Sequence, residues 1–353
     1  MLITLSQYRE WGAPAFLVAE AGVNHEGNID TALELVRAAA AAGADAIKFQ
    51  TYTASRLATR SSHAYWDEAK EPTESQFDLF SRYDSFAEPE YRRIADECAA
   101  ADIAFITSAF DVESIDWIDE LVAAFKIASG DITNVPLLTR LAHTRKPLLL
   151  STGASTLAEI SDAVALLDRE GSGEVAILQC TLAYPTPTEF AAVGGLRELA
   201  DVFGNRPLGY SDHTTPPDSF TVIAAAYVLG ARVIETHFTL DRSLPGNDHY
   251  HSFEPAELRR LVDELARVRS LLGQPVKVVL PIEERARVGA RRSVVARTDI
   301  PRGTPLTPDL LDVKRPGGGV PPSFLVDSAG WRAAVDIAED TTIEWQMLVQ
   351  DAG

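Results

Sequence analysis

Residues 16–50 read FLVAEAGVNHEGNIDTALELVRAAAAAGADAIKFQ, and this stretch carries the pattern that decides the fold. A short apolar run at 16–20 leads into an alanine-rich segment of helical period at 30–43, and a second apolar run follows at 45–50. Gly43 stands where a helix would need a residue that tolerates a left-handed conformation. The stretch therefore predicts a strand, a helix and a second strand, joined as in a parallel sheet.

The same alternation continues along the chain to about residue 272. Six further apolar runs follow, at 103–108, 124–129, 147–152, 175–180, 207–212 and 232–237. Segments with helical period lie between and after them, at 88–101, 112–121, 134–143, 156–169, 189–201, 218–229 and 254–271. Residues 51–87 form an insertion that we expect to be irregular. Eight buried strands alternating with helices predict a closed (β/α)₈ TIM barrel in the α/β class.

A doubly wound open sheet is the alternative architecture. No GxGxxG follows a predicted strand and no GxxxxGK[ST] occurs, so the two nucleotide-binding signatures of such sheets are missing from the sequence.

After about residue 280 the sequence changes to short β-rich runs interrupted by proline and glycine. This pattern predicts a small, β-rich second domain. A domain of this length buries little apolar surface, so we expect it to pack against a barrel. We expect a barrel domain over 1–280, a linker over 281–290 and a β-rich domain over 291–353.

The composition restricts the possible partners. The 353 residues carry a formal net charge of −19, which argues against nucleic acid or an anionic membrane surface as a partner. The first residues lack the pattern of a signal peptide, and no apolar stretch is long enough to cross a bilayer, so we expect a cytoplasmic protein. Cys98 and Cys180 have neither disulfide nor metal-ligand spacing and are expected to be buried apolar residues.

Polar residues occur where the predicted strands end, which is the edge that carries the active site in TIM barrels. They are Glu20, Lys48, Gln50, Ser108, Lys126, Ser129, Ser151, Gln179, Ser211, His213, Glu235 and His237. A serine or glutamine there can be an ordinary solvated strand end. A lysine charge among apolar residues, however, is costly unless an anion compensates it. Lys48 and Lys126 therefore predict a pocket for a small anion such as a phosphate or carboxylate ester.

Two histidines end neighbouring predicted strands, His213 the seventh and His237 the eighth. With carboxylates nearby they suit a divalent ion, and the alternative is that each bonds a carbonyl or transfers protons without metal. His25 can be structural or catalytic, while His249 and His251 lie in a loop that could reach over the barrel mouth. The acidic segment 67–90 is expected to be solvated surface.

Several motifs together resemble the sialic acid synthase family, also called N-acetylneuraminate or nonulosonate synthases. They are AEAGVNHEGN, AIKFQT, FKIASGDITN, LSTGAS, QCTLAYPTP, GYSDHT, IETHFTLDR and VKRPGGG. The tail resembles the antifreeze-like (SAF, β-clip) domain that follows the barrel in that family. The resemblance implies condensation of phosphoenolpyruvate with an N-acylated hexose such as N-acetylmannosamine, giving a nine-carbon 2-keto sugar acid and phosphate. It also implies a divalent metal, with Mn²⁺ first and Mg²⁺ or Co²⁺ as alternatives.

The resemblance assigns roles to individual positions. Phosphoenolpyruvate would be held by Lys48, Ser108, Lys126, Ser129, Ser151 and Ser211. The sugar would be held by Gln50, Tyr184, Asp248 and Arg315, and catalysis would involve Glu20, Asp131, Tyr184 and Glu235. The metal would be bound by His213 and His237. Arg315 corresponds to an arginine that the small domain lends to the partner's barrel, which implies a homodimer with swapped SAF domains.

Some positions depart from the family pattern. Leu182 stands where an asparagine or serine is usual for the phosphate, and Ser108-Ala109 replaces a Thr-Pro pair. Asp131 replaces a glutamate that contacts the sugar, and Gly289 stands near the position of an aromatic residue. These changes concern mostly the acceptor. A legionaminic- or pseudaminic-type synthase, an enzyme making a shorter keto acid phosphate, and a non-catalytic sugar-binding relative therefore remain as alternatives.

Overall fold

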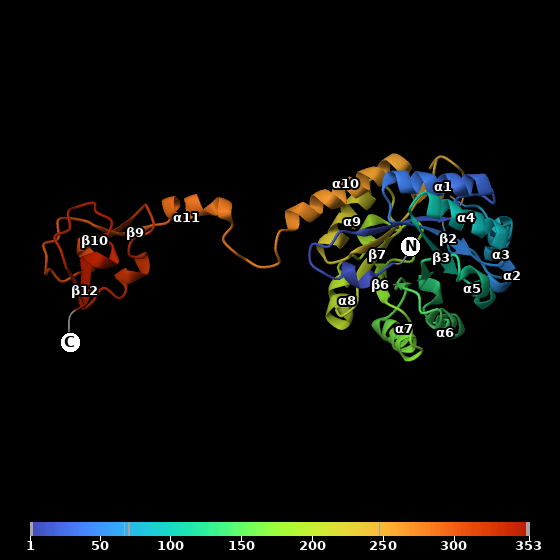
Figure 1. The fold of residues 1–353 in the computed structure, drawn as a ribbon, viewed down its shortest axis with the longest axis horizontal. Helices are drawn as coiled ribbons and strands as arrows, with labels where there is room; N and C mark the ends of the chain where they lie inside the picture. The colour runs from blue at the N-terminus through green and yellow to red at the C-terminus, as the bar shows by residue number, and fades with distance from the viewer. Residues whose placement is uncertain (1–2, 67, 70, 247, 351–353) are drawn as a thin grey trace. The chain divides into compact units, whose positions relative to one another are not determined.

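The computed structural model describes residues 3–66, 68–69, 71–246 and 248–350. The chain divides into two compact units, Met1–Pro275 and Val276–Gly353. In the first unit eight parallel strands close into a barrel in sequence order (Figure 1). The strands are β1 (Phe16–Gly22), β2 (Ala46–Thr51), β3 (Ala104–Ala109), β4 (Ala124–Ile127), β5 (Leu148–Ser151), β6 (Val175–Cys180), β7 (Leu208–Asp212) and β8 (Val233–His237). The predicted TIM barrel is thus confirmed.

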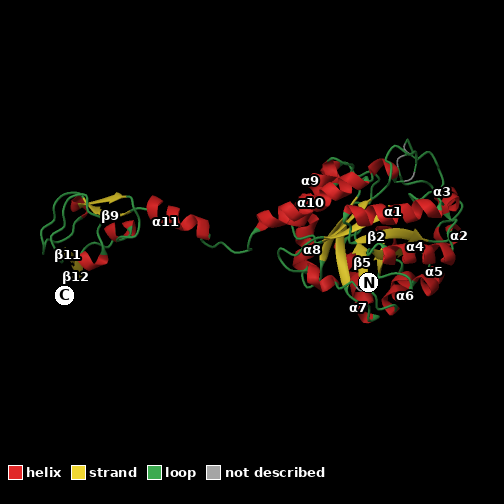
Figure 2. Ribbon diagram, turned by 45° about the horizontal axis from the view of Figure 1, so that its top comes forward, coloured by secondary structure: helices red, strands yellow, loops and turns green. Residues whose placement is uncertain are grey.

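Helices surround the strands on the outside of this unit (Figure 2). They are α1 (Ile29–Ala42), α4 (Glu88–Ala100), α5 (Val112–Ile118), α6 (Val135–His143), α7 (Leu157–Arg169), α8 (Gly195–Phe203), α9 (Asp218–Val228) and α10 (Pro255–Leu272). Local signals set their ends. At the start of α1, the Asn28 side chain accepts hydrogen bonds from the backbone of Asp30 and Thr31. At its end Gly43 has φ +89°, as its position in the sequence predicted.

Two sequence-based expectations about the helices need correction. The insertion at 51–87 is partly helical, with α2 (Ala54–Leu57) and α3 (Gln76–Tyr83). The helix expected at 189–201 begins later, because only a short 3₁₀ turn, Thr188–Phe190, precedes α8. Between them the backbone of Ala192 is left-handed, with φ +49°, and it breaks the helical path.

Every second residue of a barrel strand faces the interior, and these residues form two layers. The lower layer is apolar and includes Phe16, Val18, Ala46, Ala104, Ile106, Ala124, Leu149, Ala176, Leu178 and Val233. Leu5, in the 3₁₀ turn Leu5–Tyr8, belongs to the same cluster and is fully buried. The next inward residue on each strand lies towards the carboxyl end, where Glu20, Lys48, Ser108 and Lys126 follow.

Strand pairing brings several of the polar residues side by side. Glu20 pairs with Lys48 on one side and with His237 on the other, and Ser108 pairs with Lys126. Because the strands are parallel, all their carboxyl ends meet at the same rim. Residues from the first and the last strand of the barrel, which are far apart in the sequence, therefore lie in a single site.

The second unit contains two small antiparallel sheets. One joins β9 (Ser293–Ala296) to β10 (Leu311–Lys314), and the other joins β11 (Trp331–Ala333) to β12 (Leu348–Gln350). They enclose a separate apolar core that includes Val294, Ile300, Leu311, Phe324, Ile337 and Ile343. The prediction of a small β-rich second domain is thereby confirmed. Within 281–290, the stretch that we predict to be a linker, the chain forms a 3₁₀ turn, Pro281–Glu283, and α11 (Glu284–Ala290).

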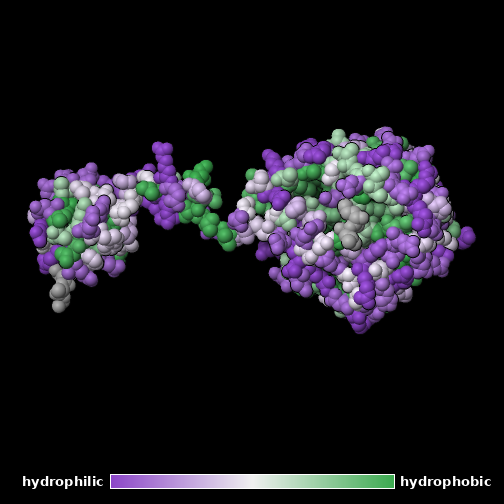
Figure 3. All heavy atoms as spheres, in the orientation of Figure 1, coloured by the Kyte–Doolittle hydropathy of each residue, from purple (hydrophilic) through white to green (hydrophobic). Residues whose placement is uncertain are grey.

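The segment before that turn exposes apolar side chains. Val276, Val278, Val279, Leu280 and Ile282 are between 41% and 87% exposed, and the segment is visible as a green group in Figure 3. None of the helices in the described ranges has the length and apolar character required to span a membrane.

Candidate active site

A cavity of about 400 Å³ opens at the carboxyl ends of the strands. Its volume lies in the range of about 300–1,000 Å³ that small-molecule sites usually have. Its lining includes these residues predicted from the sequence: Glu20, Lys48, Gln50, Ser108, Lys126, Ser129, Asp131, Ser151, Tyr184, Ser211, His213, Glu235, His237 and Asp248. Arg315 is exposed and follows β10 in the second unit. Of the strand-end residues, Gln179 does not line this cavity, because it alternates with the inward-facing Leu178 and Cys180.

Lys48 forms one of two buried ion pairs in the cavity. Its Nζ lies 2.5 Å from Oε2 of Glu20 and donates to Oγ of Ser108 at 3.1 Å. Gln50 donates from Nε2 to the other oxygen of Glu20 at 3.2 Å. Burial alone would lower the pKa of Lys48, but the carboxylates of Glu20 and Glu235 raise it above its usual value. Lys48 is therefore a fixed positive charge.

Lys126 forms the second pair, with Glu235. The Nζ–Oε1 distance is 3.0 Å, and the hydroxyl of Ser211 donates to the same oxygen at 3.1 Å. Burial opposes ionisation of Glu235, yet Lys126 and then Lys48 lower its pKa to about 2. The sequence predicted that an anion must compensate each buried lysine. The structure shows that carboxylates of the chain itself do so, and a bound ligand would share these lysines with them.

Two serines present hydroxyl groups towards the cavity. Ser151 is buried, and its Oγ has no hydrogen-bond partner among the described residues. Oγ of Ser129 accepts a bond from the backbone of Gly153 at 2.9 Å, which leaves its own hydrogen free to donate. Gly153 is needed there, since a Cβ would lie 2.9 Å from Ser129 Oγ and 3.0 Å from the backbone nitrogen of Leu182. The pocket therefore offers neutral donors beside the two lysines.

His213 has a defined tautomer. Its Nδ1 lies 2.8 Å from the carbonyl oxygen of Thr181, and because a carbonyl can only accept, Nδ1 carries the hydrogen. Burial lowers the pKa of His213, so the ring is neutral and its Nε2 has a lone pair for a metal. Tyr184 packs on this ring at a centroid distance of 4.2 Å, and the rings of His213 and His237 are 5.3 Å apart.

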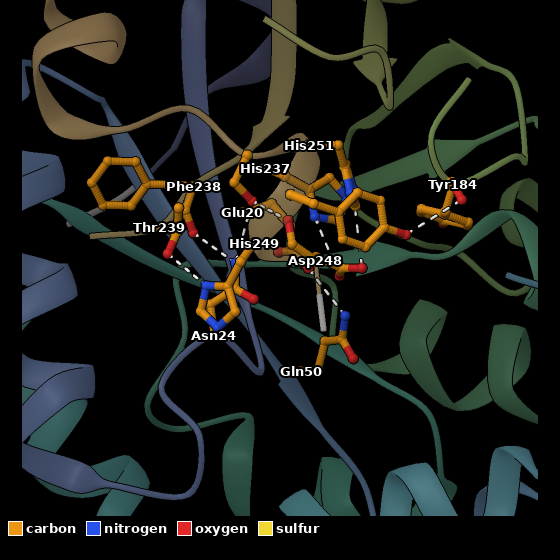
Figure 4. Close-up of polar contacts among 12 residues, drawn as sticks. Glu20, Asn24, Gln50, Tyr184, His237, Phe238, Thr239, Asp248, His249 and His251 are labelled. Carbon is orange, nitrogen blue, oxygen red and sulfur yellow. Dashed lines mark hydrogen bonds and ion pairs between the residues drawn. The ribbon is translucent and has the colours of Figure 1, made fainter. Parts of the chain in front are cut away.

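His237 belongs to a second group of possible ligands, shown in Figure 4. Its Nδ1 lies 3.3 Å from Oδ2 of Asp248, and its ring centroid is 4.5 Å from that of His251. One ligand atom from each of these three residues lies within 4.8 Å of the others. His213, the other histidine predicted from the sequence, is not in this group. The sequence places His251 only in a loop, and its membership in this group depends on how that loop folds.

His249 lies in the same loop but points elsewhere. Its Nδ1 is 2.7 Å from the hydroxyl of Thr239, and its Nε2 is 3.7 Å from Glu26 (Figure 4). His25 is also structural, since its Nδ1 accepts from the backbone of Gly27 and its ring stacks on Phe86. Neither histidine lines the cavity.

The insertion between β2 and α4 supplies one wall of the cavity, so the expectation of solvated surface for 67–90 is wrong for the residues that line the cavity. Tyr65, Trp66, Glu71, Gln76, Leu79, Phe80 and Tyr83 line it. Glu71 is 97% buried, with an exposed fraction of 3%. The signal available in the sequence was the unusual density of aromatic residues at 65–83, which an acidic solvated segment would not need.

Asp131 and Tyr184 complete the polar lining. Burial raises the pKa of Asp131, although a hydrogen bond from Asn134 partly opposes this. Burial also raises the pKa of Tyr184 well above its usual value. Tyr184 therefore keeps its proton and can donate a hydrogen bond to a ligand, whereas Asp131 holds a proton more readily than an exposed carboxyl group does. Cys98 and Cys180 are free and buried as expected, but Cys180 also lines the cavity.

A closed barrel whose carboxyl rim gathers two lysines, hydroxyl groups and imidazoles defines a TIM-barrel enzyme that acts on small anionic substrates. The NeuB family model matches residues 35–277, and the SAF domain model matches residues 291–349. The chain belongs to the NeuB family. It is thus an enzyme of the sialic acid synthase family, whose members are phosphoenolpyruvate-dependent transferases.

Relatives resemble the chain over almost its full length. An uncharacterized protein of Methanocaldococcus jannaschii, MJ1065, is 38% identical over 96% of both chains. The N,N'-diacetyllegionaminic acid synthase of Legionella pneumophila is 36% identical over 94% of both chains. Among solved structures, the N-acetylneuraminic acid synthetase of Leptospira borgpetersenii is 32% identical with a TM-score of 0.69. The match covers 78% of this chain and 90% of that one.

Proposed function

We propose that this enzyme condenses phosphoenolpyruvate with an N-acylated hexose in its open-chain form, producing a nine-carbon 2-keto sugar acid and phosphate. The observation that carries the proposal is the convergence of Lys48 and Lys126, each buried and ion-paired, in one cavity with His213 and His237. The lysines and the hydroxyl groups of Ser108, Ser129, Ser151 and Ser211 supply the donors for the phosphate and carboxylate of phosphoenolpyruvate.

The charges in the cavity support a divalent ion as the third component. Lys48 and Lys126 face the carboxylates of Glu20, Glu235 and Asp248, so these groups do not provide an excess of positive charge for an anionic substrate. His213 presents a neutral Nε2, and the buried Nδ1 of His237 makes no hydrogen bond to any described residue. These imidazoles fit a divalent ion such as Mn²⁺, with Mg²⁺ or Co²⁺ as alternatives. When bound, the ion would polarise the aldehyde oxygen of the sugar.

The chain's own residues would position the reactants. Held by the lysines and serines, phosphoenolpyruvate presents C3 to the aldehyde carbon, where the new C–C bond forms and the aldehyde oxygen takes up a proton. Water then adds to C2 and loses one proton, which leaves a hydroxyl on C2. The bond from C2 to the phosphate oxygen then breaks, the C2 hydroxyl gives its remaining proton to the departing phosphate, and C2 becomes the ketone of the product. The walls formed by Tyr65, Trp66 and Phe80 would limit the access of bulk water.

Proton transfer can be assigned from the protonation states. Glu235 is ionised beside Lys126 and cannot serve as an acid near neutral pH, so we assign it to positioning and electrostatic roles. Asp131, whose pKa is raised, and Tyr184 are the proposed donors to the sugar. Glu20, within reach of Gln50 and Lys48, is the proposed acceptor for the proton of water.

The acceptor sugar is proposed to lack a phosphate group. Lys48 and Lys126 are the only lysine or arginine residues among the described residues that line the cavity, and both are needed for phosphoenolpyruvate. The relative from Legionella is named for a diacetylated acid, which supports an acetamido sugar of the mannosamine, legionaminic or pseudaminic type. Gln50, Tyr184 and Asp248 are the proposed sugar contacts. We further propose a homodimer in which Arg315 of the SAF domain reaches the partner's barrel, and a cytoplasmic location.

The test is to mix the enzyme with phosphoenolpyruvate, Mn²⁺ and a panel of acylamino hexoses, and to measure both phosphate release and product mass. A nine-carbon keto acid from one panel member would support the proposal. Phosphorylated sugars are added to the panel as a second set of acceptors. A seven- or eight-carbon product with a terminal phosphate would indicate the shorter keto acid reaction, and a nine-carbon product with one would contradict the proposed unphosphorylated acceptor. Absence of turnover across the whole panel would favour a non-catalytic sugar-binding protein.

A further inference from the structure

His251 is a buried imidazole that makes no hydrogen bond to any of the described residues. It ends the 3₁₀ turn His249–His251, which follows β8, and only 1% of it is exposed. Neither of its ring nitrogens makes a hydrogen bond to any residue in the described parts of the chain. Buried polar atoms in folded proteins are nearly always bonded to protein, water or an ion. An imidazole with two orphan nitrogens therefore points to a group that binds there.

The neighbours of His251 indicate what that group is. Its Nε2 lies 4.0 Å from Oδ1 of Asp248, too far for a hydrogen bond, and its ring lies 4.5 Å from that of His237 (Figure 4). The Nδ1 of His237 is likewise buried without a hydrogen bond to a described residue. Ligand atoms that share one ion at about 2.0–2.2 Å lie roughly 3–4 Å from one another. The one short contact in the group, 3.3 Å between Nδ1 of His237 and Oδ2 of Asp248, is not aligned as a hydrogen bond. The spacing of the three side chains therefore fits one shared cation.

We propose that His251, together with His237 and Asp248, is a protein ligand of the divalent ion in this enzyme. His237, Asp248 and His213 all line the cavity, so an ion held by the two imidazoles and the carboxylate would supply a positive charge beside the proposed substrate site. The ion is the one that the proposed function requires, so the inference rests on that function for its role, but not for its existence. Because His251 and Asp248 lie in the loop after β8, the ion would also hold this loop against the barrel.

A ligand set of this kind has a consequence for metal selectivity. Nitrogen donors favour later transition metals over Mg²⁺, which prefers oxygen ligands and retains its water. Adding His251 to the set therefore shifts the preference of the site from Mg²⁺ towards Mn²⁺ and Co²⁺. The same loop residue links metal binding to the position of Asp248, which is also a proposed sugar contact.

The first experiment measures Mn²⁺ binding to the full chain without substrates, by electron paramagnetic resonance of the free ion. We expect His251→Ala to weaken the Kd for Mn²⁺ roughly tenfold or more, since even indirect partners of metal ligands are worth about 10–100-fold. His143→Ala is the matched control, because His143 is an exposed imidazole at the end of α6. It should leave the Kd unchanged. An unchanged Kd for a folded His251→Ala would overturn the proposal.

A second measurement does not depend on the variant folding. In crystals of the unaltered protein soaked with Mn²⁺, anomalous scattering locates the ion directly. A bond from the ion to a ring nitrogen of His251 supports the proposal, and an ion bound by His213 and His237 with His251 out of reach overturns it. Failure of the condensation reaction would appear only in the product assay with phosphoenolpyruvate and sugars. Metal binding by His251 and the proposed function can thus fail separately.

Discussion

Lys126 and Glu235 form an ion pair across the barrel interior, with 3.0 Å between Nζ and Oε1, although 109 residues separate them in the chain. The side chains are only 5% and 4% exposed. Removing one partner of a buried ion pair typically destabilises a protein by about 3–5 kcal/mol, because the remaining charge is left uncompensated. The pair therefore connects stability to substrate binding, because the same lysine is proposed to bind phosphoenolpyruvate.

Replacing Lys126 by alanine should raise the KM for phosphoenolpyruvate much more than the KM for the sugar. The variant also leaves Glu235 as a buried carboxylate without its lysine, so its Tm should fall. Steady-state kinetics and thermal unfolding check both effects. Lys146→Ala is the control. Lys146 donates to backbone carbonyls at the amino-terminal ends of the strands, away from the cavity, and does not line it. Equal losses in both KM values would contradict the role given to Lys126.

The Glu235 carboxylate should make stability depend on pH in the acid range. Its pKa is about 2 in the folded protein against 4.5 for the ordinary group. The lowered value means that Glu235 stabilises the fold fully above about pH 4.5, and that this contribution disappears as the pH falls towards 2. Urea unfolding between pH 6 and pH 3 should show a shallower loss of stability for Glu235→Gln than for the unaltered protein. Glu120→Gln, at an exposed position, should follow the unaltered protein.

The Ser151 hydroxyl offers a way to separate binding from folding. Because its Oγ has no partner among the described residues, Ser151→Ala should change the Tm little. The same change should raise the KM for phosphoenolpyruvate by roughly tenfold, the value of a hydrogen bond of about 1.4 kcal/mol. Ser114→Ala is the contrasting variant, because the buried Ser114 hydroxyl donates a hydrogen bond to Asp111 at 2.7 Å. Loss of this bond should lower the Tm and leave the KM for phosphoenolpyruvate unchanged. A Ser151 variant that loses stability without any effect on KM would refute this assignment.

Removing the imidazole of His237 should abolish metal-dependent turnover. His237 is close to both His213 and Asp248, so His237→Ala affects the ion under either ligand set. We expect kcat to fall by at least about 10²-fold in Mn²⁺, with circular dichroism unchanged. Chelator treatment of the unaltered enzyme should have the same effect and be reversed by Mn²⁺. Full activity after removal of all metal would exclude the proposed role of the ion.

Arg315 tests the proposed dimer. If it reaches the barrel of a partner, Arg315→Ala should raise the KM for the sugar and leave that for phosphoenolpyruvate unchanged. Arg302→Ala, an equally exposed arginine of the same unit, is the control. Deletion of residues 285–353 should have a larger effect in the same direction. A fully active monomeric barrel after this deletion would rule the arrangement out.

The positions that line the barrel interior could be predicted from the sequence because their signal is local. In DAIKFQ and AFKIAS the lysine stands among apolar residues, and the alternation of strand side chains places it inside the barrel. The same alternation excludes Gln179 from the barrel interior, because the neighbouring residues Leu178 and Cys180 face inward and Gln179 therefore faces outward. Strand ends and helix stops such as Gly43 were likewise predictable, since each depends on a few neighbouring residues.

The tertiary structure alone decided the contacts between residues that are distant in the sequence. No periodic pattern of apolar and polar residues in the sequence predicts such contacts. The pairing of Lys48 with Glu20 and of Lys126 with Glu235 depends on which side chains meet across a closed barrel. The aromatic wall from the insertion and the approach of His251 to His237 depend on how irregular loops fold over the rim. Loop conformations are determined by many weak long-range contacts, whereas the barrel follows from a strong local pattern repeated eight times. The sequence therefore determined at which edge of the barrel the site would lie, and the fold determined which of its side chains form ion pairs and which lie together around the cavity.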